Sequence, residues 1–241
     1  VGAYGQEAKN VIESVTVFNK DSHEIQNLKA SDCGFGYRSS IFNLSRRGKY
    51  IIFYINLKLS KIPRPTLSYR DVQIKFSGKN PSLAEIRNEV IKIRDQKFPF
   101  PTEAKKGNAG SFFKNPVLNE NQYKDLSVRV KNLFGDDKVA ELESKKFNEQ
   151  SAFAKALADD PLLNKIKWVK VPAAFLIELC GLKDLKSGGA AINHNQPLVI
   201  INQTGHATAQ DVLKLANEVK RAVLDKTGIA LQFEPELIGF G

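Results

Sequence analysis

Five segments of this 241-residue chain place glycine or a reactive polar side chain beside apolar residues of strand type. Three residue types in them stand out chemically: an arginine at Arg38, a serine at Ser111, and carboxylates at Glu234 and Glu236. A guanidinium is a planar donor suited to carboxylates, and a serine hydroxyl is a weak acid that protonates only a strong base. Taken singly, such residues are more often found in surface ion pairs, turns or strand ends. The segments are GAYGQE (2–7), CGFGYRSSIF (33–42), GNAGSFFKNP (107–116), GGAAINHNQPLVIIN (188–202) and GIALQFEPELIG (228–239).

The sequence motifs of well-known nucleotide, metal and hydrolase sites are absent or incomplete. GFGYRS has Ser39 where a dinucleotide fingerprint needs its third glycine, and no convincing helix follows it. The sequence contains neither a GxxxxGK[ST] phosphate loop nor a GxSxG nucleophile elbow. The three histidines are far apart and outside any HExxH context, and two cysteines are too few for a disulfide framework or a Cys-based zinc site. We therefore expect no metal site.

Composition and charge favour a folded protein with anionic partners. Hydrophobic residues make up 42% and charged residues 26%, and the net charge is +10. Nucleic acid and phosphorylated small molecules both fit that charge. No Lys/Arg run exceeds two residues, and no aromatic–basic signature of an RNA-binding module is present. We expect no nucleic-acid partner, and a non-catalytic basic nucleotide- or nucleic-acid-binding module is the alternative function.

The same composition bears on location and completeness. Apolar runs such as YIIFYI from Tyr50 are far too short for a transmembrane helix, and the chain lacks a signal peptide, so we expect no membrane partner. Two free thiols suit a reducing cytoplasm. Translation begins with Met, whereas this sequence contains no Met and opens with Val1. We therefore expect it to be incomplete at its N-terminus.

The alternation of apolar and polar residues predicts an α+β fold. Residues 13–18 and 50–57 are predicted strands, the second more buried, with an ordered loop at 31–40 between them. Ser82 and Glu85 form a capping box for a helix that should end before Pro99. Residues 118–168 are predicted surface helices with breaks at Asp136–Asp137 and Asp159–Asp160.

Toward the C-terminus, proline, glycine and capping residues mark the element boundaries more clearly. A helix is predicted from Pro172 to Gly181, then a strand at 198–202. Thr208 and Asp211 form a weak capping pair for a last helix that ends at Gly228. A final strand is predicted at 229–233, and alternation would place both glutamates of the EPE sequence on one face of it.

In this order and spacing, the five segments resemble the UDP-N-acetylenolpyruvoylglucosamine reductases, the MurB family of peptidoglycan synthesis. GSFFKNP and the YRxSxF element are the most specific parts. The resemblance implies an α+β chain in which 1–75 are the C-terminal part of an FAD-binding domain. Residues 76–241 would be the substrate-binding domain with the C-terminal catalytic strand. In the family, GAYG follows a further stretch with the Gly-rich loops that hold the FAD pyrophosphate.

The resemblance also implies the reaction. NADPH reduces bound FAD, and hydride then passes to the enolpyruvyl group of UDP-N-acetylglucosamine enolpyruvate, giving UDP-N-acetylmuramate. Arg38 matches the arginine that clamps the substrate carboxylate, and Ser111 matches the proton donor. Glu236, which precedes Leu237 as the family glutamate precedes an aliphatic residue, fits the third catalytic position better than Glu234. The two glycines in LIGFG leave that register open.

Six further residues match substrate-binding positions of the family. The matches imply that lysines meet the diphosphate, that polar side chains contact UDP, and that tyrosines line the active site or a mobile loop. Their alternative interpretations are a solvated lysine, a turn asparagine and a half-buried tyrosine. The expected partners are the UDP-sugar and NADPH, and the expected protein is a cytoplasmic monomer. The six residues are Tyr4, Tyr69, Lys97, Asn115, Lys183 and Gln196.

Overall fold

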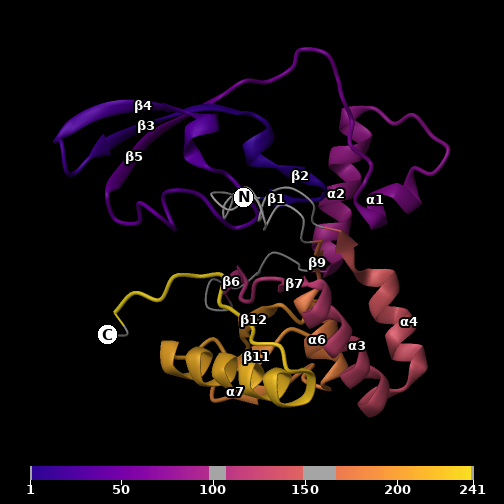
Figure 1. Cartoon of the computed structure of the whole chain (residues 1–241). Coiled ribbons are helices and arrows are strands. Elements are labelled where there is room, and N and C mark those ends of the chain that lie inside the picture. The colour runs from indigo at the N-terminus through magenta and orange to yellow at the C-terminus, as the bar shows by residue number, and fades with distance from the viewer. Residues whose placement is uncertain (1, 98–106, 149–166, 240–241) are drawn as a thin grey trace. The chain divides into compact units, whose positions relative to one another are not determined.

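A computed structural model describes residues 2–97, 107–148 and 167–239 (Figure 1). The described residues divide into two compact units, with 2–96 in the first and 97, 107–148 and 167–239 in the second. Both units combine helices with antiparallel strands, which confirms the α+β class. In the part of the chain that the structure describes, no helix is long and apolar enough to cross a bilayer.

The first unit is built on a three-stranded antiparallel sheet of order β4-β3-β5. Both predicted strands are present and lie within one or two residues of the expected bounds. A two-stranded hairpin, β1–β2, precedes the sheet and carries the GAYG sequence. The strands are β1 (Gly2–Ala3), β2 (Gln6–Glu7), β3 (Ile12–Asn19), β4 (Glu24–Lys29) and β5 (Tyr50–Leu57). Two 3-10 helices, η1 (Ala8–Asn10) and η2 (Ala30–Cys33), flank β3 and β4.

The expectation that β5 is the more buried strand is wrong. Val15 and Val17 of β3 form the sheet's small core with Cys33, whereas β5 is exposed along its length after Tyr50. Tyr54 retains 68% of its accessible surface. The reason is that β5 pairs with β3 alone among the described strands and that its side chains after Tyr50 belong to none of the described cores. A continuous apolar run is compatible with burial but does not supply the neighbours that cause it.

Two helices complete the described part of the first unit, α1 (Arg70–Lys75) and α2 (Leu83–Lys97). The predicted capping box of α2 is confirmed, because the Ser82 amide donates to Glu85 Oε2 over 2.8 Å and the Glu85 amide donates back to Ser82 Oγ. The described part of α2 ends two residues before Pro99, as expected. Val72, Phe76 and Ile93 form a separate small core between the two helices.

The second unit contains two sheets, of orders β10-β11-β12-β6 and β7-β9-β8. Its strands are β6 (Asn108–Ser111), β7 (Val117–Asn119), β8 (Phe147–Asn148), β9 (Trp168–Lys170), β10 (Lys186–Ser187), β11 (Ala190–Ile192) and β12 (Val199–Asn202). Its helices are α3 (Glu120–Phe134), α4 (Asp136–Lys145), α6 (Ala173–Leu179) and α7 (Ala209–Thr227). The helix predicted from Pro172 and the strand predicted at 198–202 are both present.

Residues 118–168 contribute to the core, so their description as surface helices is wrong in part. Leu126 and Val130 of α3 and Leu142 of α4 are fully buried in the main core, while the charged side chains of both helices remain outside. The predicted break at Asp136–Asp137 is confirmed, because Gly135 separates α3 from α4. The second predicted break, Asp159–Asp160, lies outside the described residues.

The last helix, α7, has the predicted boundaries, but the strand expected after it does not form. Thr208 and Asp211 make a reciprocal capping box, and Gly228 closes the helix in the left-handed conformation at φ 75°. Residues 229–232 are in no strand, Phe233 forms only an isolated bridge with Phe113, and the chain bends at Glu234. The placement of Glu234 and Glu236 on one strand face is therefore wrong.

Candidate active site

In the first unit, the β1–β2 turn brings Tyr4 against Tyr69. Their rings lie 5.1 Å apart between centroids in an edge-to-face arrangement, and both pack on the small core of α1 and α2. The turn needs glycine at position 5, where φ is +78° and a Cβ would lie 2.9 Å from Ser68 Oγ. Two predicted substrate residues, 65 positions apart, are thus neighbours.

Arg38 lies in a tight turn beside the same hairpin. The turn is closed by a 2.9 Å hydrogen bond from the Gly36 amide to the Ser39 carbonyl, and Asn43 Nδ2 donates to the Arg38 carbonyl. The guanidinium carbon lies 5.3 Å from the Tyr37 ring centroid. The Arg38 guanidinium also reaches β1, since a Cβ placed on Gly2 would be 4.0 Å from Arg38 Nη1. Arg38 and the Tyr4 hairpin therefore form one group.

Sequence reasoning gave no functional role to Ser39, which belongs with this group. Its hydroxyl is buried and has no hydrogen-bond partner among the residues that the structure describes. Buried hydroxyls nearly always have a partner, so an unsatisfied one in the residue next to Arg38 suits a polar ligand. In the sequence, Ser39 had significance only as the residue that breaks a dinucleotide fingerprint.

In the second unit, Ser111 is the last residue of β6 and is fixed from two sides. It is paired with Val199 of β12, and the next amide, that of Phe112, donates to the Leu198 carbonyl over 2.7 Å. On the other side, the Glu234 amide donates to the Phe112 carbonyl over 2.9 Å. The structure thus brings the C-terminal segment alongside Ser111.

The two candidate glutamates differ in environment. Glu234 is half-buried, and its backbone amide donates a hydrogen bond to Phe112, the residue after Ser111. Glu236 is exposed. The rings of Phe112, Phe113 and Phe233 meet at centroid distances of 5.3–5.9 Å and anchor this segment to β6. The assignment of Glu236 rather than Glu234 to the catalytic position stays a prediction.

Asn115 and Lys97 lie at the ends of helices. Asn115 Oδ1 accepts a 2.9 Å hydrogen bond from the Ala173 amide, so this side chain caps the first turn of α6. The backbone of Lys97 ends α2, and its side chain lies outside the described residues. Asn115 therefore has a structural hydrogen bond to α6, and its expected contact with UDP would use its remaining polar atoms.

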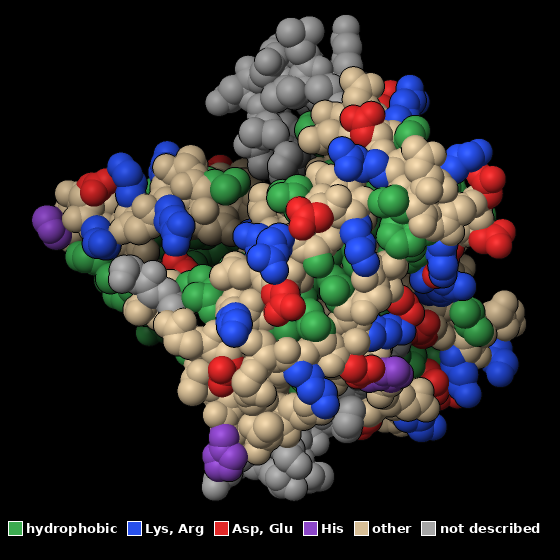
Figure 2. Space-filling view, turned by 90° about the horizontal axis from the view of Figure 1, so that it is seen from below, with side chains coloured by type: hydrophobic (Ala, Val, Ile, Leu, Met, Phe, Trp, Pro, Cys, Tyr) green, Lys and Arg blue, Asp and Glu red, His purple; other side chains and the backbone are tan. Residues whose placement is uncertain are grey.

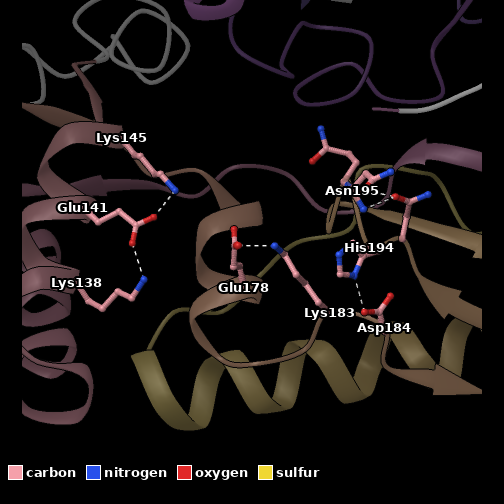
Figure 3. Close-up of polar contacts among 10 residues, drawn as sticks. Lys138, Glu141, Lys145, Glu178, Lys183, Asp184, His194 and Asn195 are labelled. Atoms are coloured by element: carbon pink, nitrogen blue, oxygen red, sulfur yellow. Dashed lines mark hydrogen bonds and ion pairs between the residues drawn. The ribbon is translucent and has the colours of Figure 1, made fainter. Parts of the chain in front are cut away.

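Lys183 and Gln196 occupy two adjoining turns, of which Figure 3 labels Lys183, Asp184, His194 and Asn195. Lys183, between α6 and β10, forms an ion pair with Glu178. Gln196 lies between β11 and β12, and its backbone N–H donates to Asn193 Oδ1 over 3.0 Å. The Ile192 amide, at the end of β11, donates to the Leu185 carbonyl over 2.9 Å, which joins the segments next to the two turns. The structure therefore brings these two predicted residues to neighbouring positions.

The remaining ionisable groups carry less of the site's chemistry. Burial raises the pKa of the Cys33 and Cys180 thiols, which disfavours the reactive thiolate at both positions. Within the described ranges, no three His, Cys, Asp or Glu side chains gather as metal ligands would. On the face drawn in Figure 2, lysines and arginines are interspersed with acidic side chains.

Comparisons with known proteins point to one family of reductases. The family model described as "UDP-N-acetylenolpyruvoylglucosamine reductase, C-terminal domain" matches residues 101–238. A protein of that reductase name from Aliivibrio fischeri is 37% identical over 97% of this chain and 58% of its own length. One from Flavobacterium johnsoniae is 33% identical over 99% of this chain and 63% of its own length.

A solved structure shares the fold. The reductase of this name from Thermus caldophilus has a TM-score of 0.55 and 21% sequence identity, and the similarity covers 98% of this chain and 56% of that one. The chain therefore spans between 56% and 63% of the length of these relatives.

Proposed function

The chain belongs to the UDP-N-acetylenolpyruvoylglucosamine reductase C-terminal domain family, and on that premise we propose that it carries out the same reduction. The substrate is UDP-N-acetylglucosamine enolpyruvate, the product UDP-N-acetylmuramate, and the electrons come from NADPH through FAD. The family match supports this, as does the position of Ser111. Ser111 is half-buried, and the backbone around it is held between β12 and the C-terminal segment, which would restrict the motion of a proton donor.

Reduction of an enolpyruvyl group makes two demands on the protein. Hydride addition to the vinyl ether leaves negative charge on the carbon next to the carboxylate, so that charge must be stabilised and then protonated. We assign the carboxylate to Arg38, whose fork of donors suits it, and the proton to Ser111. Glu236 acts with Arg38 on the enolate, by a proton or by local polarisation.

The described residues suit only part of the FAD. The buried Ser39 hydroxyl and the Tyr4–Tyr69 pair offer a donor and aromatic surface in the first unit. The glycines at 34 and 36, by contrast, open no helix, because turns occupy 41–49, so they do not form a helix-terminus cradle for phosphate. When bound, FAD supplies the hydride that it takes from NADPH.

We assign the UDP-sugar to the second unit. Lys183 meets the diphosphate as a mobile point charge, and Gln196 orients the nucleotide from the adjoining turn. Asn115 and Lys97 add further polar contacts, with Tyr4 and Tyr69 at the reacting end. The Glu178 carboxylate shares Lys183 with the incoming phosphates, which lowers the net attraction of this turn.

Steady-state and spectral measurements on the full-length protein test this function. We expect a yellow protein that oxidises NADPH rapidly only when UDP-N-acetylglucosamine enolpyruvate is present. A colourless protein indifferent to FAD would contradict the proposal. Nucleic-acid affinity with a steep salt dependence, and no affinity for nucleotide sugars, would favour the basic binding module instead.

Three further expectations belong to the same proposal. A biosynthetic reductase of this kind would act in the cytoplasm, as a monomer, without nucleic acid or membrane. The functional division into 1–75 and 76–241 stays a prediction. The two compact units of the structure divide at a different place, after Gln96.

A further inference from the structure

We propose that His194 and Asp184 form a clasp that positions the substrate-binding turns: their contact ties the turn of Lys183 to the turn of Gln196. The inference rests on the proposed function, because it assigns the diphosphate end of the UDP-sugar to these turns. Neither residue touches the reacting atoms in this proposal. Both are positioning residues, and the ligand class is a nucleoside diphosphate.

The clasp is a single short contact between two turns. His194 Nδ1 lies 2.7 Å from Asp184 Oδ2 (Figure 3). Asp184 directly follows Lys183, and His194 stands two residues before Gln196. In the second turn, Asn193 Oδ1 accepts hydrogen bonds from the amides of Asn195 and Gln196, at 2.9 and 3.0 Å. A shift of His194 would therefore be transmitted to Gln196 through a compact, internally bonded turn.

The backbone of Asp184 supports the same interpretation. Its φ is +60°, in the left-handed region that non-glycine residues rarely occupy. Aspartate and asparagine tolerate this region better than other residues. The conformation aims the carboxylate at His194 and fixes the residue after Lys183. The turn is thus held in one shape before any ligand arrives.

The charges around the clasp indicate what would control it. Lys183 is paired with Glu178 on α6, and Glu178 in turn helps to raise the pKa of Lys138 on α4, after the larger effect of Glu141. The contact between His194 and Asp184 is an ion pair only when the histidine is protonated. Histidine is the residue type that most often serves as a charge switch in proteins. Because protonation of an imidazole increases as pH falls, we expect the clasp to be stronger at lower pH.

The expected effect is small, because both side chains are largely exposed, at 70% for His194 and 55% for Asp184. Exposed ion pairs contribute little, and we expect about a two- to fivefold change in UDP affinity at low pH. UDP titrates in the same pH range, so affinity in one variant is not a sufficient measurement. A double-mutant cycle removes that contribution, since it is common to all four proteins.

The experiment is calorimetric titration of UDP into the full-length FAD-loaded protein at about pH 5.5 and about pH 8. The proteins are the parent, His194→Gln, Asp184→Asn and the double variant. At low pH each single change should weaken UDP binding by about two- to fivefold, and the double variant should be no weaker than either. The coupling should shrink at high pH. Asp184→Asn retains a residue that tolerates positive φ, so its turn should survive.

His206→Gln is the matched control, because His206 is an exposed histidine of the same unit on the loop between β12 and α7. Its UDP affinity should follow the parent at both pH values. Additive single effects, or a coupling that ignores pH, would overturn the clasp and leave the proposed function standing. Absence of UDP binding at both pH values in the parent protein would overturn both.

Discussion

At the scale of single residues, strained backbone marks the proposed site. Four non-glycine residues among those described have positive φ: Tyr4, His23, Arg38 and Asp184. Two are predicted site residues and a third follows Lys183. Such conformations cost on the order of 1–3 kcal/mol and persist where the surroundings fix them, as they do at ligand-binding positions. The hydrogen bond from Asn43 to the Arg38 carbonyl is one such restraint.

Ser111→Ala should separate the two half-reactions. Reduction of the flavin by NADPH needs no proton donor at the substrate, so its rate should stay nearly unchanged. Reoxidation by the enolpyruvyl sugar should slow by about 10²–10⁴-fold, the usual contribution of a positioned proton donor. Stopped-flow absorbance follows each half separately. If both slowed equally, or neither did, Ser111 would be a structural turn residue.

Arg38→Lys tests the carboxylate assignment. A lysine keeps the charge but offers a point donor in place of a planar fork. We expect slower reoxidation and weaker substrate binding together, whereas Ser111→Ala should bind substrate nearly normally. Equilibrium binding of the UDP-sugar beside stopped-flow rates distinguishes the two variants. Normal affinity and normal reoxidation in Arg38→Lys would remove Arg38 from the site.

At the scale of elements, the N-terminus of α7 fixes the β10–β11 turn. The Asp211 carboxylate accepts from the Thr208 amide at 2.9 Å and, more weakly, from the Gly189 amide at 3.4 Å. Glycine is needed in that turn, since a Cβ on Gly189 would lie 2.7 Å from Ala207 Cα. One carboxylate thus caps the helix and holds a turn of the four-stranded sheet β10-β11-β12-β6.

Asp211→Asn should reveal this through the pH dependence of stability. The hydrogen bond from the Thr208 backbone lowers the pKa of Asp211 below its ordinary value, and the Thr208 side chain and the Gly189 amide add to this effect. A lowered folded-state pKa means that the ionised group stabilises the fold above the unfolded value and loses that effect as pH falls through the folded value.

Urea unfolding of the parent and of Asp211→Asn measures that effect. The difference in unfolding free energy should be full at about pH 5 and smaller at about pH 3. Asp225→Asn, an exposed carboxylate of the same helix outside the capping box, is the control and should show no such loss. A difference between the parent and Asp211→Asn that is constant across this range would contradict the cap's ionic character.

At the scale of the whole molecule, the proposed site residues divide between the two units. Tyr4, Arg38 and Tyr69 belong to the first, and Lys97, Ser111, Asn115, Lys183, Gln196 and Glu236 belong to the second. The proposed substrate contacts therefore draw on parts of the chain with separate cores. The proposed diphosphate contacts lie in the second unit alone, so UDP binding should be separable from flavin binding in experiments.

A polypeptide of these 241 residues should bind the two ligands unequally. Its described part offers no glycine-rich helix terminus for the FAD phosphates, so we expect little or no flavin retention. UDP-sugar affinity should partly survive, because Lys183, Gln196 and Asn115 have their contacts inside the second unit. Calorimetry with each ligand measures both. Tight FAD binding by this segment would refute the prediction.

The sequence by itself determined the features that depend on neighbours within a few residues. The capping boxes Ser82–Glu85 and Thr208–Asp211, the end of α7 at Gly228 and the strand at 13–18 are local hydrogen-bond and alternation patterns. The five segments likewise indicated the family, because their order and spacing are properties of the chain alone.

Only the tertiary structure decided what depends on residues far apart in the chain. The exposure of β5, the burial of Leu126 and Leu142, and the failure of 229–233 to form a strand all follow from which elements pack together. The meeting of Tyr4 with Tyr69 and the His194–Asp184 contact were likewise unpredicted. A sequence pattern states which face of an element is apolar. Burial and side-chain partners are set by the surfaces that pack against that face, and these come from distant segments.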